Sequence, residues 1–278
     1  MDLEEPRSSL SAWDPAFIKR GLPVVRMLRD RYFRSTTLGA ENIVRGPAMF
    51  VGMHGGGVMA ADAVLMALAY YEATGVRRPL YFLAHASLFR IPGLAGVIRR
   101  SGAVLASPQN ARAIAQAGHA FGVFPGGEHD SSRTFGRRNE VELAGRTGFV
   151  RTALDCGVPI VPMASLGGAS TWIVLSDGRW LARAVGLKKR FRMETMAIAL
   201  ALPWGLTLGL TPYLPAPVQI DVAFGAPMRF HPSPSERHDP VYHAHLRDEV
   251  QRAMEGLIAQ MRLARVHRVR MDRVRPSG

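Results

Sequence analysis

The chain has 278 residues, of which 47% are hydrophobic, so it is long enough to bury the core of one large domain, with or without a small appendage. Its formal net charge is +13, and of its 35 Lys and Arg residues only three are lysines. The single cysteine, Cys156, excludes a disulfide framework within the chain and favours a reducing compartment.

The basic side chains gather towards both ends of the chain. Residues 19–34 carry six of them against one aspartate, and residues 262–278 also carry six against one aspartate. Such patches suit an anionic partner, either a membrane leaflet or a nucleic acid.

The first 40 residues are predicted to form a tail and a basic amphipathic helical segment, followed by one domain over residues 41–278. The acidic start lacks an apolar h-region, so we expect no signal peptide. Apolar and basic residues interleave over residues 14–33, which indicates a helix or helix pair broken near Gly21 and Pro23. This segment would either lie on a membrane or cap the main domain.

Strands and helices are predicted to alternate from residue 47 onwards, which indicates an α/β fold with a largely parallel central sheet and helices on both faces. Residues 218–224 alternate apolar and polar side chains and predict an edge strand. The predicted strands are 47–52, 80–84, 103–105, 121–125, 159–163 and 218–224, and the predicted helices are 62–73, a short one ending at 100, 148–155 and 242–265.

The longest apolar stretch runs from Met196 to Leu210 and is interrupted by Pro203 and two glycines. It falls short of the roughly 20 residues that a spanning helix needs, so no transmembrane helix is expected. Trp204 among aliphatic residues suits an interfacial anchor, and a core helix or hydrophobic lid is the alternative.

A histidine and an acid stand eight residues apart in the segment 52–62, separated by a glycine run. His54 is a candidate general base, and Asp62 a candidate partner that holds its imidazole. The glycines between them, Gly55, Gly56 and Gly57, would let backbone N–H groups approach an oxyanion or a phosphate. Because no nucleophilic Ser or Cys motif accompanies them, the segment indicates transfer to a substrate hydroxyl without a covalent enzyme intermediate.

A second glycine turn follows the predicted strand at 121–125 and opens a polar cluster over residues 126–133. Gly126 and Gly127 expose backbone donors, Arg133 can hold a phosphate or carboxylate, and Glu128 can orient a hydroxyl or that arginine. Ligands in parallel sheets gather beyond the carboxyl ends of strands, so both glycine turns are expected to meet at one crevice.

Together these segments resemble the phospholipid/glycerol acyltransferase superfamily, between about residues 45 and 230. The usual His-x4-Asp motif fails here, because Met59 stands five residues after His54, and the spacing to Asp62 looks like the His-x-Gly-Gly variant of the diacylglycerol-acyltransferase-like branch. Residues 124–128, Phe-Pro-Gly-Gly-Glu, resemble that branch's Pro-Gly-Gly block. Further blocks resemble the family in the expected order, at residues 88–94, 99–103, 144–154 and 158–162.

The resemblance implies acyl transfer from a thioester to a glycerolipid-type hydroxyl at a membrane surface. His54 would be the general base and Asp62 its partner, although Asp130 or Glu128 could orient the imidazole instead. The acceptor site would be lined by Gly126, Gly127, Glu128 and Arg133, with Arg146 as a further anion contact. The donor would be an acyl-CoA or an acyl-carrier-protein thioester, with no other cofactor and no metal, and the protein would be cytoplasmic and peripheral on the inner face of the cell membrane.

Three alternatives remain at this stage. An esterase-type α/β-hydrolase also uses a His-Gly-Gly-Gly loop, but it requires a Gly-x-Ser-x-Gly elbow that this chain lacks. A zinc site is conceivable from the nine histidines, but their spacing and the single cysteine give it no support. A non-enzymatic basic protein that binds a membrane or nucleic acid fits the charge but shows no nucleic-acid-binding motif.

Overall fold

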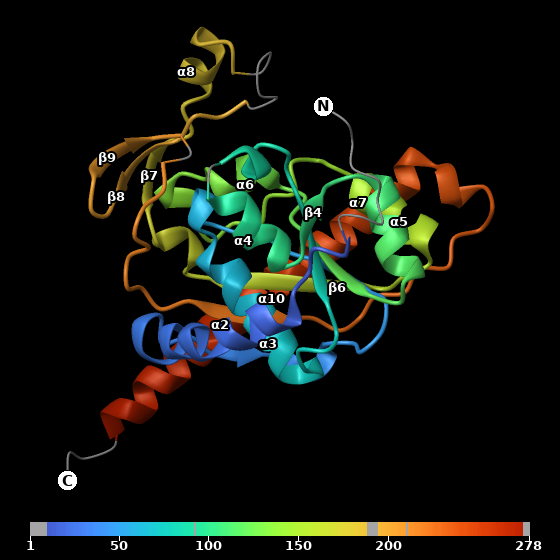
Figure 1. Cartoon of the computed structure of the whole chain (residues 1–278), viewed down its shortest axis with the longest axis horizontal. Coiled ribbons are helices and arrows are strands. Elements are labelled where there is room, and N and C mark those ends of the chain that lie inside the picture. Colours follow the sequence, from blue (N-terminus) through green and yellow to red (C-terminus); the bar gives the residue numbers. More distant parts are fainter. Residues whose placement is uncertain (1–9, 92, 188–193, 210, 275–278) are drawn as a thin grey trace.

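The computed structural model describes residues 10–91, 93–187, 194–209 and 211–274. A seven-stranded sheet lies between two layers of helices, and a three-stranded sheet projects from one end of this body (Figure 1). The strands are β1 (Thr37–Leu38), β2 (Met49–Val51), β3 (Leu80–Ala84), β4 (Ala103–Leu105), β5 (Ala120–Val123), β6 (Ile160–Leu166), β7 (Ile173–Ser176), β8 (Ile198–Ala201), β9 (Gly205–Leu208) and β10 (Asp221–Phe224). The α-helices are α2 (Pro15–Met27), α3 (Ala61–Thr74), α4 (Leu94–Arg100), α5 (Pro108–Gln116), α6 (Gly127–Ser131), α7 (Gly148–Cys156), α8 (Arg179–Ala184) and α10 (Pro240–Val274).

The central sheet has the strand order β1-β10-β6-β2-β5-β3-β4. Its neighbouring strands are parallel except for β10 and β6, which are antiparallel. The predicted α/β class, with a largely parallel sheet between helices, is therefore confirmed. The carboxyl ends of β2, β5 and β6 lie side by side, because these three strands are adjacent and parallel.

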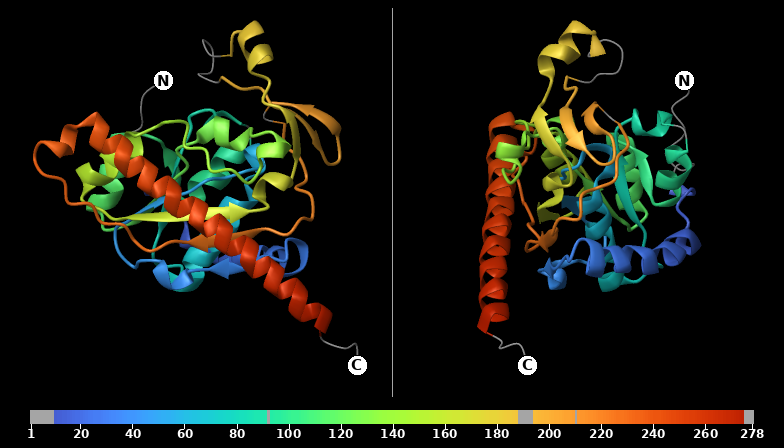
Figure 2. Two further views of the ribbon diagram at one scale, coloured as in Figure 1. Left: turned by 180° about the vertical axis from the view of Figure 1, so that it is seen from behind. Right: turned by 90° about the vertical axis from the view of Figure 1, so that its left-hand side faces the viewer.

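Alternation along the central strands divides the core into two layers. In β2, Met49 and Val51 face a cluster that includes side chains of α5, α7 and α10, whereas Phe50 faces a cluster built on α3. The long helix α10 crosses the first face and extends past the edge of the sheet (Figure 2). Both faces of the sheet are thereby removed from water, as its continuously apolar strands require.

Helix α5 is absent from the sequence-based expectation, although it carries a recognisable start signal. Ser107 is its N-cap, and its hydroxyl accepts a hydrogen bond from the Asn110 N–H at 3.1 Å. Pro108 follows at the first helical position, where the missing N–H costs nothing. The short apolar face of Ala111 and Ile114 packs into the core on this side.

The prediction that residues 218–224 form an edge strand is wrong. Only residues 221–224 form a strand, β10, and it lies between β1 and β6 with all four residues buried. The alternation came from Asp221, a polar residue that a central strand tolerates here because charged partners surround it. Its carboxylate pairs with Arg265 and Arg268 of α10 and accepts hydrogen bonds from Thr36.

The N-terminal amphipathic segment is helical and packs on the body of the protein. Ile18 and Leu22 of α2 lie against the core layer of α3, and Arg26 and Arg29 both form ion pairs with Glu72 of α3. Of the two expected placements, the described contacts are those of a cap on the domain. The predicted break at Pro23 is absent, because α2 continues to Met27. Most of the expected N-terminal tail, residues 1–9, lies outside the described residues.

Residues 198–201 and 205–208 of the apolar stretch form strands, so its interpretation as a core helix is wrong. Strands β8 and β9 make an antiparallel hairpin, and β7 pairs with β8 on its other side. None of the described helices is long and apolar enough to cross a membrane.

Candidate active site

The two glycine motifs meet at the carboxyl ends of β2 and β5, as expected. Residue 52 follows β2 directly, residue 124 follows β5, and Val51 pairs with Val123 across the two strands. The main-chain N–H of His54 then donates to Oδ2 of Asp130 at 2.7 Å, which joins the two motifs directly. A third loop, residues 167–172, follows the neighbouring strand β6 and completes the group.

The His54 imidazole is held by packing. Its ring meets the Phe124 ring edge to face, with the ring centres 4.7 Å apart, and Phe124 stacks in turn on Phe82. His54 Nδ1 is buried and has no hydrogen-bond partner among the described residues. This orientation leaves Nε2 as the nitrogen that can meet a substrate.

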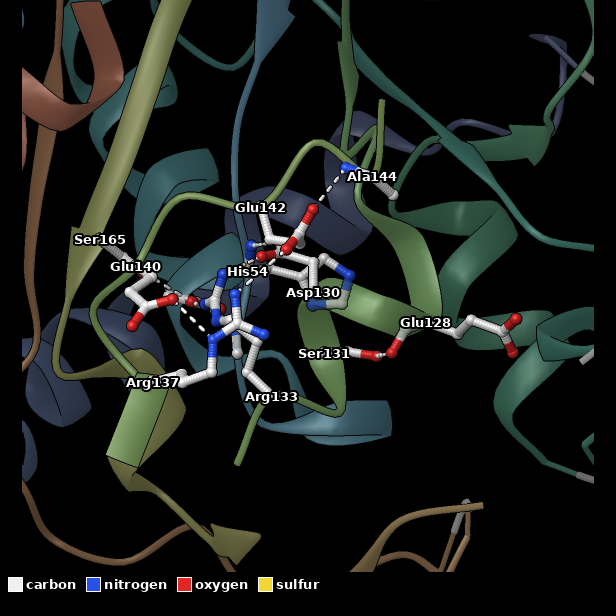
Figure 3. Close-up of polar contacts among 12 residues, drawn as sticks. His54, Glu128, Asp130, Ser131, Arg133, Arg137, Glu140, Glu142, Ala144 and Ser165 are labelled. Atoms are coloured by element: carbon white, nitrogen blue, oxygen red, sulfur yellow. Dashed lines mark hydrogen bonds and ion pairs between the residues drawn. The ribbon is translucent and has the colours of Figure 1, made fainter. Parts of the chain in front are cut away.

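Asp130 is the acid most closely associated with His54 (Figure 3). It is fully buried, accepts from the His54 N–H and forms an ion pair with Arg133 through Oδ1. Burial raises the pKa of this carboxyl to about 6, although the charges of Arg133 and His54 both oppose the rise. Asp130 is therefore a carboxylate at neutral pH, next to a histidine that becomes cationic when it takes up a proton.

Asp62 lies elsewhere than the sequence suggested. Its Oδ2 accepts from the Gly55 N–H at 2.8 Å and from the Ser165 hydroxyl at 2.7 Å, while Oδ1 accepts from the Ala63 N–H. These are contacts with the glycine run and with β6, so Asp62 fixes the backbone that follows His54. The predicted bond from Asp62 to the imidazole is not among its contacts here, and its catalytic role stays a prediction.

The glycine run packs tightly against the loop 167–172. A Cβ on Gly55 would lie 2.3 Å from the Ala169 backbone, and Gly56 has φ +80°, which favours glycine. The Tyr213 hydroxyl donates to the Gly56 carbonyl at 2.7 Å and also contacts the Thr171 hydroxyl. The Gly55 N–H, offered by the sequence as an oxyanion donor, is already committed to Asp62.

The Pro-Gly-Gly turn is equally constrained, and it contains two of the predicted acceptor-site glycines. A Cβ on Gly126 would lie 2.2 Å from the Glu142 carbonyl oxygen, and Gly127 has φ +54°. Arg146 donates from Nη1 to the Pro125 carbonyl at 2.8 Å. Arg146 therefore braces this turn with one nitrogen, and its role as an anion contact stays a prediction.

Glu128 points away from His54 (Figure 3). Its Oε1 accepts from the Glu194 N–H at 2.8 Å, which connects the turn to the segment that leads into β8. Of the three acids considered as partners for the imidazole, Asp62 and Glu128 thus form their hydrogen bonds with other residues, and Asp130 contacts the histidine backbone.

Arg133 is buried beside a small polar cavity of about 50 Å³. Its Nε and Nη2 are buried and have no hydrogen-bond partner among the described residues. Two further arginines line the cavity, and each has a carboxylate partner: Arg137 pairs with Glu140 and Glu142, and Arg179 with Asp177. The cavity thus offers hydrogen-bond donors whose positive charge is already compensated.

Several residues of the site escaped the sequence reasoning. Ser165 lies inside β6, beyond the end of the predicted strand 159–163, and Tyr213 lies far along the chain from Gly56. Trp172 stacks on Tyr213, with ring centres 5.4 Å apart, and also touches the position where Gly57 would carry a Cβ. The glycine pair Gly167–Gly168 directly after a strand was a usable signal, since it repeats the pattern of the other two turns.

A second concavity lies at the opposite end of the sheet. It has a volume of about 190 Å³ and is lined by residues that precede β2, β3 and β5, among them Arg45, Arg77, Arg78 and His119. It is remote from His54, because amino and carboxyl ends of parallel strands lie at opposite edges. Among the described residues no cluster of His, Cys, Asp or Glu has the arrangement of a metal site.

The loops at the carboxyl ends of a largely parallel α/β sheet thus bring together a half-buried histidine and a buried acid, an arrangement that fits an acyltransferase. Residues 34–166 match the family model described as Acyltransferase. This match supports the phospholipid/glycerol acyltransferase superfamily that the motifs suggested.

Comparison with known proteins agrees with this assignment. The fold is similar to the crystal structure of the 1-acyl-sn-glycerophosphate (LPA) acyltransferase PlsC from Thermotoga maritima, with a TM-score of 0.54 and 18% identity over 88% of this chain and 80% of that one. An uncharacterized protein of Mycobacterium tuberculosis is 28% identical over 86% of this chain. Diacylglycerol O-acyltransferase 2 of Xenopus laevis is 28% identical over 58% of this chain and 46% of its own length. The chain spans 64% of the length of the mycobacterial relative.

Proposed function

We propose that the protein transfers a fatty acyl group from a thioester donor to the hydroxyl of a glycerolipid at a membrane surface. The observation that carries this proposal is the pairing of His54 with buried Asp130 across the two family motifs. The acyltransferase family of residues 34–166 and the fold support the reaction class.

In the proposed reaction His54 Nε2 accepts the proton of the acceptor hydroxyl, because Nδ1 is buried. The acceptor oxygen bonds to the thioester carbonyl carbon, the C–S bond breaks, and the departing thiolate takes the proton back from the imidazolium. The Asp130 carboxylate stabilises that imidazolium by its charge. General-base catalysis of this kind contributes about 10²–10⁴-fold to the rate.

The tetrahedral intermediate carries a negative oxygen, which needs N–H donors. Since the Gly55 N–H is committed to Asp62, we assign this role to the main-chain N–H groups of Gly56 and Gly57. Each such donor is typically worth about 10²–10³ in rate. Asp62 acts as a positioning residue, because it fixes Gly55 between the histidine and these donors.

The acceptor is proposed to be a neutral glycerolipid such as diacylglycerol. Arg133 is paired with Asp130, and Arg137 and Arg179 are also paired with carboxylates, so the cavity beside the site carries little uncompensated positive charge. A phosphate acceptor would need such charge. The similarity to a diacylglycerol O-acyltransferase favours the same acceptor.

Thiol release from acyl-CoA donors, measured with diacylglycerol, monoacylglycerol and lysophospholipid acceptors, tests the proposal. We expect release that depends on a neutral acceptor and falls about 10²–10⁴-fold in His54→Ala. His245→Ala is the matched control, since His245 lies on α10 and pairs with Glu249. Release without any acceptor would instead indicate a hydrolase, and preference for a lysophospholipid would refute the neutral acceptor. If acyl-CoA is inert, the same assay with an acyl-carrier-protein thioester decides between donors.

The remaining expectations rest on the same proposal. The reaction needs no cofactor beyond the thioester substrate, and the basic ends of the chain support an anionic membrane surface as its location. We propose the inner face of the cell membrane, where cytoplasmic thioester donors are available.

A further inference from the structure

The small sheet β7-β8-β9 has its larger apolar side chains on the solvent side. Strand neighbours Ile173, Leu200 and Leu206 stand in one row, because Ile173 pairs with Leu200 and Leu200 with Leu206, and all three are exposed. Leu175 and Leu208 are exposed as well. The opposite face carries buried small residues, among them Ala199, Ala201 and Thr207. Together these five exposed side chains form one aliphatic surface, which we call the outer face.

Contiguous apolar surfaces of this kind are uncommon on soluble domains and mark sites of interaction. The outer face belongs to the sheet that projects from the body, and Figures 1 and 2 show this sheet together with α8 standing clear of the central layers. The exposed fraction of Leu206 is 63%, so the surface is open rather than folded back on the domain.

Two exposed tryptophans lie near this sheet along the chain. Trp204 lies in the turn between β8 and β9 and is 64% exposed, and Trp180 on α8 is 63% exposed. The indole Nε1 of Trp204 donates to the Pro212 carbonyl at 2.8 Å, so its ring can enter an apolar phase with its donor satisfied. Tryptophan at such a margin is typical of the boundary between lipid headgroups and acyl chains.

The charge of this segment indicates which partner covers the surface. The sequence of residues 171–214 contains six Lys and Arg residues against two acids; of the two basic residues that the structure describes, Arg179 pairs with Asp177 and Arg183 is exposed on α8. Like charges disfavour a second copy of the same surface, whereas an anionic lipid leaflet complements it.

The sheet is also connected to both catalytic motifs. Trp172, next to β7, stacks on Tyr213, whose hydroxyl bonds the Gly56 carbonyl. On the other side Glu194 donates its N–H to Glu128, and the Thr195 and Ser132 hydroxyls are 3.2 Å apart. A surface docked on this sheet would therefore lie next to the loops that contain His54 and Asp130.

We propose that the outer face of β7-β8-β9 is the surface by which the protein docks on an anionic lipid bilayer. Its aliphatic side chains would enter the acyl boundary, Trp180 and Trp204 would lie at the headgroup level, and the basic residues would contact anionic headgroups. The consequence for lipid acceptors rests on the proposed function, but docking itself is measurable without acyl transfer.

The test is flotation of the full chain with vesicles of phosphatidylcholine containing a minor share of phosphatidylglycerol. We expect Leu200→Ser/Leu206→Ser/Leu208→Ser to reduce vesicle affinity by about tenfold or more. The free energy of a tenfold change in affinity is smaller than that gained by fully burying one leucine side chain. The control is Val97→Ser/Val241→Ser, which replaces exposed apolar residues of α4 and α10 outside the basic ends and should leave binding unchanged. Thermal melting of each variant establishes that it is folded. Unchanged binding of the leucine variant would overturn the proposal.

Quenching of tryptophan fluorescence by brominated acyl chains gives an independent readout. The quenching should disappear in Trp180→Phe/Trp204→Phe, because the remaining Trp13 packs against the main core and Trp172 is buried in the cluster on the inner side of the small sheet. Persistent quenching in this variant, or a wild-type dimer that the leucine variant abolishes, would refute the assignment. If wild type shows no acyl transfer but binds vesicles through these leucines, the proposed function fails and the docking surface stands.

If wild type is active, the leucine variant should retain its rate on acceptor dispersed in detergent and lose it on acceptor embedded in vesicles. Equal loss in both assays would show damage to the site and would contradict a docking role.

Discussion

The main-chain N–H of His54 and the carboxylate of Asp130 are 2.7 Å apart, although 76 positions separate them in the sequence. This bond fixes the backbone of the proposed base with a buried acid from the other motif. The same carboxylate also pairs with Arg133, so Asp130 contacts both His54 and Arg133. Replacing Asp130 should lower both stability and acyl transfer, and the two effects can be measured separately.

Asp130→Asn should lower both stability and acyl transfer, because it leaves Arg133 buried without its carboxylate. Removing one partner of a buried pair typically costs about 3–5 kcal/mol. The double variant Asp130→Asn/Arg133→Met removes the stranded charge and should recover much of the stability while activity stays low. Urea unfolding and thiol release on both variants make the comparison, and full activity in the double variant would exclude Asp130 from catalysis.

The stability contributed by Asp130 should decrease as pH rises from about 4 to about 6. Burial raises the pKa of its carboxyl from 3.8 to about 6. Between these values the folded state keeps a proton that the unfolded chain has released, so the folded state is favoured at the lower pH and loses this advantage as pH increases. The free energy of unfolding of wild type minus that of the double variant, measured across this range, should fall; a flat or rising difference would refute the shift.

Gly168→Ala should displace Asp62 and thereby disorder the glycine run. The added Cβ would lie 2.2 Å from Asp62 Oδ2, which would have to leave the Gly55 N–H and the Ser165 hydroxyl. Buried groups that lose their partners cost about 1–3 kcal/mol, and a displacement near the reacting groups can cost about 10²-fold in rate.

Gly96→Ala is the matched control for this substitution. Gly96 lies inside α4 with open space where a Cβ would go, so alanine there should stabilise by about 0.5–1 kcal/mol and leave kcat unchanged. Equal stability and equal kcat of Gly168→Ala and Gly96→Ala would show that the Asp62 contacts contribute to neither quantity.

Arg265→Ala should destabilise the protein without changing catalysis. Burial raises the pKa of Asp221, but the hydrogen bonds from Thr36 and Arg265 outweigh this effect, and its pKa is lowered. Without the Arg265 contacts, the remaining partners offset less of the cost of burying the Asp221 carboxylate. We therefore expect the free energy of unfolding to fall by about 2–3 kcal/mol.

The exposed Arg262 on the same helix serves as the control, since its replacement by alanine should change the free energy of unfolding by less than about 0.5 kcal/mol. Denaturant unfolding compares the two variants. An Arg265→Ala protein as stable as wild type would show that Arg268 and Thr36 suffice for Asp221.

Local pattern predicted the α/β class well, because buried parallel strands and glycine turns at their ends leave clear signals. It misplaced β10, since Asp221 looked solvent-exposed while its partners Arg265 and Arg268 stand more than 40 positions away. The strands β8 and β9 were missed because an aliphatic run with its large side chains facing outwards does not alternate as a half-buried hairpin does.

The candidate site was predictable as a set of loops but not as a set of contacts. His54 and the Pro-Gly-Gly turn could be placed together from strand order alone. The roles of Asp62 and Arg133 depend on which partner each side chain reaches inside the fold, and spacing along the chain carries no information about partners such as Ser165 and Tyr213.

The pairing of β1 with β10 has a consequence for how the chain assembles. Thr36 and Asp221 bond across 185 positions, and Asp221 is held in turn by Arg265 near the end of α10. Contacts between such distant segments slow folding, because a long loop must close before they form. During synthesis this side of the sheet therefore stays incomplete until α10 has left the ribosome, whereas β2, β3, β4 and β5 can pair much earlier.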